Sequence, residues 1–342
     1  MQTAKNLKKE KITYQNKNLF FMHNFNNKKI LILGGSGFVG TNLTIKLSNY
    51  KCKIISTYNT KKPKIKKNKR IKFLKIDLLK NFERKKKIFN GIDYVFMCAA
   101  NTSGADIIEK KPLNHLTPNL IMNSKVFDMA YQAKVKKLCF ISSSTVYPNK
   151  KNTIFENDVN YKFFSKYYIV AWMKLFSEKM CEMYDSKIKK PMKTIVVRPS
   201  NLYGPYDKFD PNLSKVIPSI IRKSIYSKKY LEVWGDGKDI KDFLYIDDFI
   251  DGMLTAFKND KIKVVNISYG KSVSLKKVIS LIKKNINDKL IVKHNLTKPS
   301  MIPFRKISNN LIKRASNWYP KIDIETGLKK TIYWYINSVI KN

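Results

Sequence analysis

Short runs of apolar residues recur along the first 200 positions and alternate with longer segments whose apolar positions have helical spacing. The short runs are typical of buried strands, and the periodic segments are typical of amphipathic helices. Strands are predicted at residues 29–33, 53–57, 71–75, 94–97, 137–141 and 193–197. Helices are predicted near residues 39–49, 116–133 and 161–184. This alternation predicts an α/β fold, a doubly wound parallel Rossmann sheet with helices on both faces.

The pattern changes after residue 200, where Pro and Gly become frequent, although residues 240–246 and 263–267 again resemble strands. We therefore expect a dinucleotide-binding domain over 28–200. A smaller, mainly substrate-binding part should follow over 201–342, interleaved with the Rossmann sheet. Residues 1–27 are polar, rich in Lys and Asn, and without periodicity, which predicts a disordered basic extension. Met22, just before the first strand, is a candidate start of translation.

Basic residues dominate the charge: 68 Lys and Arg face 25 Asp and Glu, giving a formal net charge of +43. Such a charge favours a nucleic-acid partner. However, only six of the basic residues are Arg, and the lysines are spread among many Asn and Ile, which share A/T-rich codons. The densest block, residues 61–72, lies between two predicted strands without a recognition helix. Genome composition therefore explains the charge, and we expect no nucleic-acid partner.

Other compositional features exclude several further classes. No apolar run approaches the 18 or so residues that a membrane span needs, and the apolar residues 19–22 are too few for a signal-peptide core. The cysteines are single and scattered, and the three histidines form no cluster along the sequence. We therefore expect a reduced, cytoplasmic protein that holds no metal and has no membrane partner.

A glycine-rich turn follows the first predicted strand, with the spacing Gly34-x-x-Gly37-x-x-Gly40. The first glycine permits a tight turn, the second lets backbone amides approach a pyrophosphate, and the third allows close packing of helix and strand. The free amides at the start of the next helix then face the phosphates. An ordinary glycine turn is the alternative. The run of strand–helix units around the motif favours a dinucleotide site.

The end of the second strand bears on the choice between NAD and NADP. A carboxylate there would hold the ribose hydroxyls of NAD and repel a 2′-phosphate. Residues 56–62 contain no carboxylate and end in Lys61 and Lys62, which favours NADP over NAD. Asp77, after the third strand, is placed to meet the adenine amino group, or is an ordinary helix N-cap.

Several motifs occur in a defined order along the chain. Cys98-Ala99-Ala100 follows the fourth strand, and residues 142–148 (SSSTVYP) follow the fifth. Further on come residues 198–205 (RPSNLYGP) and 234–248 (WGDGKDIKDFLYIDD). With the glycine turn, these motifs make residues 28–338 resemble the extended short-chain dehydrogenases/reductases of the NAD-dependent epimerase/dehydratase type. The stretches 118–120, 135–138 and 214–223 resemble the nucleotide-sugar enzymes of the GDP-L-fucose synthase group.

This resemblance implies roles for particular residues. Ser143 would hydrogen-bond the sugar oxygen at the reacting carbon, and Lys174 would bind the nicotinamide ribose and supply positive potential. Lys215 stands where the related enzymes have a general-acid His. The substrate would contact Asn201, Lys215, Lys223, Trp234 and Lys241, the last in place of an arginine that grips the diphosphate. Besides the glycines, Asp77 and Lys174, the cofactor would contact Phe38, Val39, Leu78, Ala99, Ala100 and Pro199.

The resemblance also implies a homodimer that pairs the helices predicted at 116–133 and 161–184 in a four-helix bundle. Both helices are rich in large apolar residues, and more than one face of the second is apolar.

One position departs from the family pattern. The chemistry normally needs a Tyr four residues before the Lys, about one helical turn or ~6 Å away, so that the ammonium lowers the pKa of the phenol. Here that position is Val170. Tyr167 lies roughly one turn too far from Lys174, and Tyr168 points elsewhere on the predicted helix. Thr145 also stands where the related synthases have a Cys.

Three functions therefore stay open. The first is NAD(P)-dependent epimerisation or reduction of a nucleotide diphosphate sugar, with hydride transfer at C4 of the hexose, for surface-polysaccharide synthesis. The second is a catalytically silent relative that binds the cofactor or the sugar nucleotide, an interpretation that rests on Val170 alone. A DNA-binding protein is the third and least supported alternative.

Overall fold

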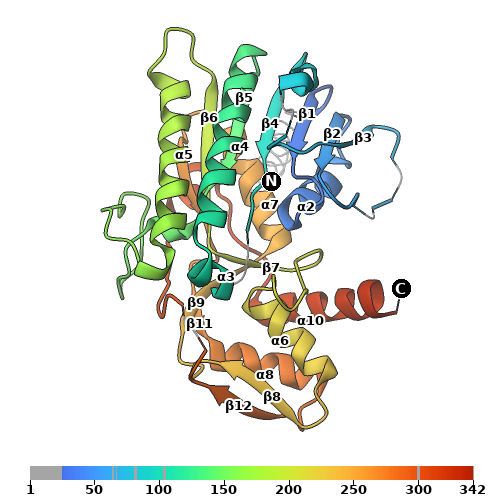
Figure 1. Cartoon of the computed structure of the whole chain (residues 1–342), viewed down its shortest axis with the longest axis vertical. Coiled ribbons are helices and arrows are strands. Elements are labelled where there is room, and N and C mark those ends of the chain that lie inside the picture. Colours follow the sequence, from blue (N-terminus) through green and yellow to red (C-terminus); the bar gives the residue numbers. More distant parts are fainter. Residues whose placement is uncertain are drawn as a thin grey trace, which may run out of the picture.

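A seven-stranded parallel sheet forms the centre of the larger part of the molecule in a computed structural model (Figure 1). The structure describes residues 25–63, 65–66, 68–80, 83–102, 105–298 and 301–341. The strands of this sheet are β1 (Lys29–Leu33), β2 (Lys53–Tyr58), β3 (Ile71–Lys75), β4 (Tyr94–Met97), β5 (Lys137–Ile141), β6 (Lys193–Pro199) and β10 (Val264–Ile267). Their order is β10-β6-β5-β4-β1-β2-β3, with every pairing parallel. The expected doubly wound α/β fold is confirmed.

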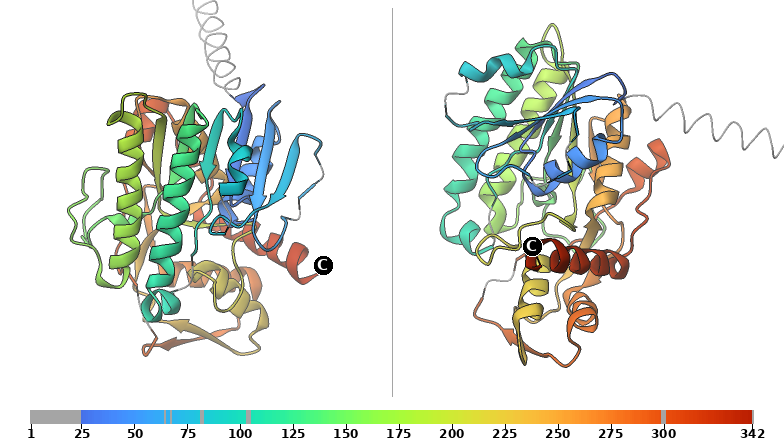
Figure 2. Two further views of the ribbon diagram at one scale, coloured as in Figure 1. Left: turned by 45° about the horizontal axis from the view of Figure 1, so that its top comes forward. Right: turned by 90° about the vertical axis from the view of Figure 1, so that its right-hand side faces the viewer.

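Helices cover both faces of this sheet. One face carries α2 (Phe38–Leu47) and α7 (Ile246–Lys258), and the other carries α4 (Leu113–Gln132) and α5 (Tyr168–Ser186), which lie side by side (Figures 1 and 2). Successive residues of a strand point to opposite faces. Accordingly, Ile30 and Ile32 of β1 pack in the cluster that includes α2 and α7, whereas Leu31 and Leu33 pack in the cluster that includes α4.

The smaller part contains two short sheets. Its strands are β7 (Asn201–Tyr203), β8 (Tyr230–Trp234), β9 (Ile240–Tyr245), β11 (Ser272–Ser274) and β12 (Ile291–Asn295). β9 pairs in parallel with β7 and antiparallel with β11, and β8 pairs in parallel with β12. The helices of this region are α6 (Val216–Tyr226), α8 (Leu275–Ile286), α9 (Asn310–Ser316), α10 (Ile324–Tyr335) and the π-helical η5 (Ile336–Ile340). The remaining elements are α3 (Ala105–Lys110) and the 3₁₀ turns η2 (Glu83–Phe89), η3 (Ser144–Val146) and η4 (Ser165–Tyr167).

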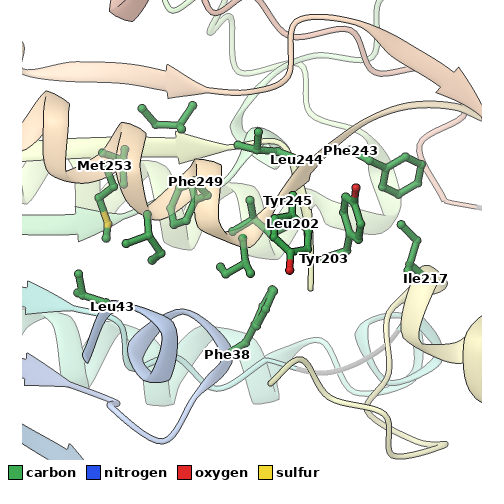
Figure 3. Packing of buried hydrophobic residues seen from close by; sticks show 14 of the residues in the cluster. Phe38, Leu43, Leu202, Tyr203, Ile217, Phe243, Leu244, Tyr245, Phe249 and Met253 are labelled. Atoms are coloured by element: carbon green, nitrogen blue, oxygen red, sulfur yellow. The ribbon is translucent and has the colours of Figure 1, made fainter. Parts of the chain in front are cut away.

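One apolar core joins the two parts. Phe38 and Leu43 of α2 belong to the same buried cluster as Tyr203, Ile217 and Phe243 from the C-terminal region (Figure 3). Strand β10 also returns from that region to pair with β6 in the large sheet. The position of the glycine-rich turn relative to the C-terminal part is therefore fixed by packing as well as by the chain.

Two predicted segments had incorrect boundaries. The helix predicted at 161–184 begins at Tyr168, because residues 165–167 form the separate turn η4. The segment predicted to be disordered includes Phe25, but this side chain is fully buried and stacks on Phe257 at 5.9 Å between ring centroids. An aromatic residue in a polar segment can still complete a core that the local pattern does not reveal. The rest of that prediction, residues 1–24, lies outside the described residues.

Among the described residues, no helix combines the length and apolar character that crossing a membrane requires.

Candidate active site

The glycine-rich turn lies at the carboxyl end of β1, where the sheet order reverses between β1 and β4. Ligands of such folds bind at this switch point. Gly34 has φ +80°, and a Cβ on it would lie 2.6 Å from the Cα of Ala99, in the loop after β4. A Cβ on Gly40 would lie 2.2 Å from the carbonyl oxygen of Gly34. The backbone therefore passes where a side chain would not fit, and the turn lies against Ala99.

The start of α2 is open to an anion. Gly37 is its N-cap residue, and no side chain of the described residues caps the first amides. Unsatisfied amides at a helix start carry a partial positive charge and bind phosphates. Phe38 and Val39 follow directly, so the predicted phosphate contacts lie at one helix end. The residues present therefore fit the pyrophosphate of a dinucleotide.

Thr57 at the end of β2 holds the turn in place. Its hydroxyl accepts a hydrogen bond from the amide of Gly34 at 3.1 Å, and its carbonyl accepts one from the amide of Gly35 at 2.6 Å. At the end of β3, Asp77 accepts from the amide of Leu79 at 2.9 Å and begins no helix, so the N-cap alternative was wrong. Leu78, between them, is buried.

Lys174 and Ser143 flank the carboxyl end of β5. The Lys174 Nζ donates to the carbonyl oxygen of Ile141 at 2.8 Å and lies 4.9 Å from the ring centroid of Phe140. Burial lowers the pKa of Lys174 to about 8, although the charge of Glu178 acts in the opposite direction. Ser143 precedes η3, and its hydroxyl oxygen accepts from the amide of Thr145 at 3.2 Å.

Val170 stands one turn before Lys174 on α5 and is half-buried. Two tyrosines stand near this position in the sequence. Tyr167 is the N-cap of α5, and burial raises its pKa to about 12, while the charge of Arg305 partly opposes this. Tyr168 is 52% exposed and makes an edge contact with Trp172.

A buried polar network supports this region, and sequence reasoning missed its centre. Glu178, one turn after Lys174, accepts from the Nε of Arg198 at 3.0 Å and from the hydroxyl of Ser142. Arg198 also donates to the hydroxyl of Tyr147 at 2.9 Å. The sequence offered an indication of this network, because Glu178 stands four residues, about one helical turn, after Lys174. Arg198 of β6 therefore links this strand to α5. It lies next to the predicted cofactor residue Pro199 at the end of β6.

Lys215 belongs to the C-terminal part of the chain and lies near the start of α2, the helix that follows the glycine turn. It is the N-cap residue of α6, and its Nζ is 5.7 Å from the ring centroid of Phe38. Two hydrogen bonds hold the segment that precedes α6. Asn42 of α2 donates to the carbonyl of Pro205 at 3.0 Å, and Lys208 donates to the carbonyl of Thr102 at 3.1 Å. The segment before α6 thus connects α2 with the loop after β4.

Sequence reasoning assigned no role to three groups near this segment. The Nε2 of His115 and the Oδ2 of Asp207 are buried, and neither atom has a hydrogen-bond partner among the described residues. Burial lowers the pKa of His115, and the charge of Lys208 acts in the same direction. Burial raises the pKa of Asp207, although the charges of Lys215 and Lys208 oppose this. The sequence placed the histidines apart, so nothing indicated this proximity.

The other predicted substrate residues already have partners within the protein. Asn201 donates from Nδ2 to the carbonyl of Asp242 at 2.9 Å, which joins β7 to β9. The Nζ of Lys241 lies 3.0 Å from the carboxylate of Asp239 and 3.0 Å from the carbonyl of Ile302, so its charge is balanced.

Lys223 and Trp234 lie together, with the Nζ 5.5 Å from the ring centroid. Lys223 also pairs with Glu232 at 2.9 Å. Trp234 is 36% exposed, and the Nζ of Lys298 also lies 5.5 Å from its ring centroid.

Solved structures agree with this fold, and curated proteins match most of the chain. GDP-L-fucose synthase from Sinorhizobium fredii is 26% identical over 333 residues, which cover 94% of this chain and 99% of the synthase. The solved structure of an epimerase from Methanothermobacter thermautotrophicus superposes with a TM-score of 0.82 at 22% identity, covering 93% and 94% of the two chains. UDP-glucose 4-epimerase from Thermotoga maritima, solved with UDP-glucose, gives a TM-score of 0.80 at 23% identity, covering 91% and 99%.

The model of the NAD dependent epimerase/dehydratase family matches residues 30–268, from β1 through β10. This match covers more than half of the chain, and it includes the glycine turn, Ser143 and Lys174. The chain therefore belongs to the NAD-dependent epimerase/dehydratase family.

Proposed function

We propose that this chain is a cytoplasmic NAD(P)-dependent nucleotide-sugar epimerase or reductase that acts by hydride transfer at C4 of the hexose. By analogy with GDP-L-fucose synthase, it would serve surface-polysaccharide precursor synthesis. The observation that carries the proposal is that a half-buried Lys174 donates to the carbonyl of Ile141 at the carboxyl end of β5, where Ser143 follows two residues later. Residues 28–200 would hold the cofactor, and residues 201–342 would supply most of the substrate contacts.

Each of the two residues has a specific task. Because the Ser143 oxygen already accepts from the amide of Thr145, its own proton is available to donate to the sugar oxygen at the reacting carbon. The Lys174 ammonium, held in a low-dielectric position, would stabilise negative charge that develops on that oxygen. The nicotinamide cofactor would supply the hydride acceptor or donor.

We propose NADP rather than NAD as the cofactor. Thr57 occupies the end of β2 and uses both its oxygens to hold the glycine turn. The following residues carry no carboxylate up to Lys62, so nothing in that stretch would repel a 2′-phosphate. The relative affinities for NADPH and NADH, measured by fluorescence titration, test this choice. An NADH affinity at least equal to that for NADPH would contradict it.

We also propose a homodimer in which α4 and α5 of each subunit form a four-helix bundle. These helices pack against each other and leave large apolar side chains exposed. The exposed members are Leu113, Ile121, Tyr168, Trp172, Phe176 and Met183. Monomers rarely expose so much apolar surface on one face.

Val170 supports a second candidate function, a silent protein that binds the cofactor or a sugar nucleotide without turnover. A valine has no titratable proton, so the phenol that normally exchanges a proton with the substrate is missing from this position. Nicotinamide absorbance under single turnover separates the two functions when a panel of nucleotide sugars and 4-keto sugars is used. Absorbance changes with any of them support the enzyme. Tight binding of cofactor and nucleotide sugar without any change supports the silent relative.

A further inference from the structure

A cavity of about 900 Å³ opens at the amino ends of β4, β5 and β6. Its walls come from the end of α4, the loops that lead into β5 and β6, and the end of α7. In Figure 1 this is the end of the large sheet farthest from the smaller part, whereas the glycine turn lies at the opposite, carboxyl edge. The volume is within the roughly 300–1,000 Å³ range of small-molecule sites.

The lining is strongly cationic. One carboxylate, Asp260, lines the cavity with six lysines: Lys134, Lys136, Lys137, Lys190, Lys193 and Lys258. The high lysine content of the whole chain does not by itself explain this local excess of lysines over carboxylates. A second cavity, of about 180 Å³, is lined by two lysines and two aspartates.

Ion pairs within the protein neutralise part of this charge. Asp260 pairs with Lys137 at 2.9 Å and with Lys193, and Asp93 pairs with Lys136 at 2.7 Å. Lys258 is within the field of Asp251.

Helix ends neutralise a further part. α4 and α7 end at this cavity, and each C-terminus carries about half a negative charge. With the three carboxylates counted as well, an excess of about two positive charges remains at the cavity, and such an excess attracts anions. The first 24 residues cannot supply counter-charge, since they contain five lysines and one glutamate.

The cavity also has an aromatic wall. Tyr94 and Tyr131 are half-buried there, and the ring of Phe257 supports Tyr94 in an edge contact at 5.1 Å. Lysine ammonium groups bind phosphates as point charges, and aromatic rings accept planar groups by stacking.

We propose that this cavity binds a small polyphosphorylated anion of nucleotide size, separately from the cofactor site. A ligand with at least two negative charges balances the excess, and two sources have that chemistry: a nucleoside triphosphate and an inorganic polyphosphate.

The test uses the full chain and two probes, ATP and inorganic tripolyphosphate. Isothermal titration calorimetry measures their binding in the Gly37→Val background, in which the phosphate turn is blocked, and with NADPH present in the wild type. The double variant Lys134→Asn/Lys190→Gln removes two exposed cavity lysines, and Asn tolerates the positive φ of position 134. Lys228→Gln/Lys313→Gln removes two exposed lysines elsewhere as the matched control.

We expect the cavity variant to weaken binding about 10-fold or more, because it removes two ammonium groups that would make charge-assisted bonds to the ligand. The control pair should change binding less than about 2-fold, because distant exposed charges are screened. ATP binding much tighter than tripolyphosphate would identify a nucleotide as the ligand, and equal binding would identify the phosphates alone. Equal losses in the two double variants would show only the general field of a basic protein and would overturn the proposal. So would the absence of binding in both cofactor-blocked experiments.

Discussion

The Lys174 ammonium donates a hydrogen bond to the main-chain carbonyl of Ile141, 2.8 Å away, where β5 ends. This bond ties the middle of α5 to the edge of the sheet beside Ser143. It holds the charge in position although position 170 is a valine, so the missing phenol does not disturb the placement of the lysine. The geometry of the site and its proton chemistry are therefore separable questions.

Burial of Lys174 predicts a specific pH dependence of stability. Its pKa is lowered to about 8 in the folded protein, against about 10.4 in an unfolded chain. Between these values the unfolded state binds more protons, so the unfolding free energy should rise with pH across this window. Relative to Lys174→Met, the wild type should gain up to about 3 kcal/mol between pH 7.5 and 10.5.

Urea unfolding at a series of pH values measures this difference. The exposed Lys187 gives the matched control, because Lys187→Met should show no such gain. A flat difference between wild type and Lys174→Met would show that the ammonium is solvated.

The glycine turn predicts a loss of binding without a loss of fold. Gly37 has φ −77°, which any residue adopts, and an added Cβ would lie 3.2 Å from the carbonyl oxygen of Gly34. Gly37→Val should therefore abolish dinucleotide binding and change the melting temperature little. Gly34→Val is the contrast, since its φ of +80° and its contact with Ala99 should destabilise the protein itself. Unchanged NADPH affinity in Gly37→Val would mean that the turn binds no phosphate.

The sequence revealed local features well and long-range proximity poorly. The strand at residues 29–33 and the turn at Gly34 were predictable because their apolar run and glycine spacing are local. The burial of Phe25 was not, because its partners Tyr94 and Phe257 come from distant elements. The proximity of Lys208 to His115 was hidden for the same reason, since a loop must fold back across the site to bring them together.

Phe25 should contribute strongly to stability, although it lies in a polar segment. Its ring is fully buried and contacts Tyr50, Tyr94 and Phe257. Phe25→Ala should lower the unfolding free energy by about 3–5 kcal/mol, the range for large buried aromatics. Phe155→Ala, at a ring that is 45% exposed, should cost far less. A chain that starts at Met22 retains Phe25 and should keep the melting temperature of the full chain. Equal effects of Phe25→Ala and Phe155→Ala would contradict the packing described here.

The proposed dimer places Phe176 in an interface. This ring is 51% exposed on α5, near Trp172, which is 39% exposed. Phe176→Glu should convert a dimer into a monomer at micromolar concentration, because a charge would be buried without a partner. Light scattering gives the mass directly. Tyr333→Glu, at a 73% exposed ring on α10, is the control and should leave the mass unchanged. A monomeric wild type would remove this part of the proposal.

Val170 decides between the enzyme and the silent relative. In an active enzyme, proton transfer must run without a phenol, through Ser143, an ordered water or a side chain such as Lys215. Ser143→Ala should then reduce single-turnover hydride transfer severely. Because a general acid–base group contributes ~10²–10⁴-fold, the wild type should turn over slowly rather than not at all.

Two substitutions at position 170 test this directly. Val170→Tyr places a phenol one turn from the Lys174 ammonium. It should raise the rate of hydride transfer by ~10²-fold or more. Val170→Phe adds the same ring without the hydroxyl, so it controls for packing in the half-buried site and should give no increase. In a silent protein, neither substitution would produce turnover, and Ser143→Ala would change nothing. Vigorous wild-type turnover that is indifferent to Ser143→Ala would place the catalytic groups elsewhere, because a hydroxyl that donates to the reacting oxygen cannot be removed without loss of rate.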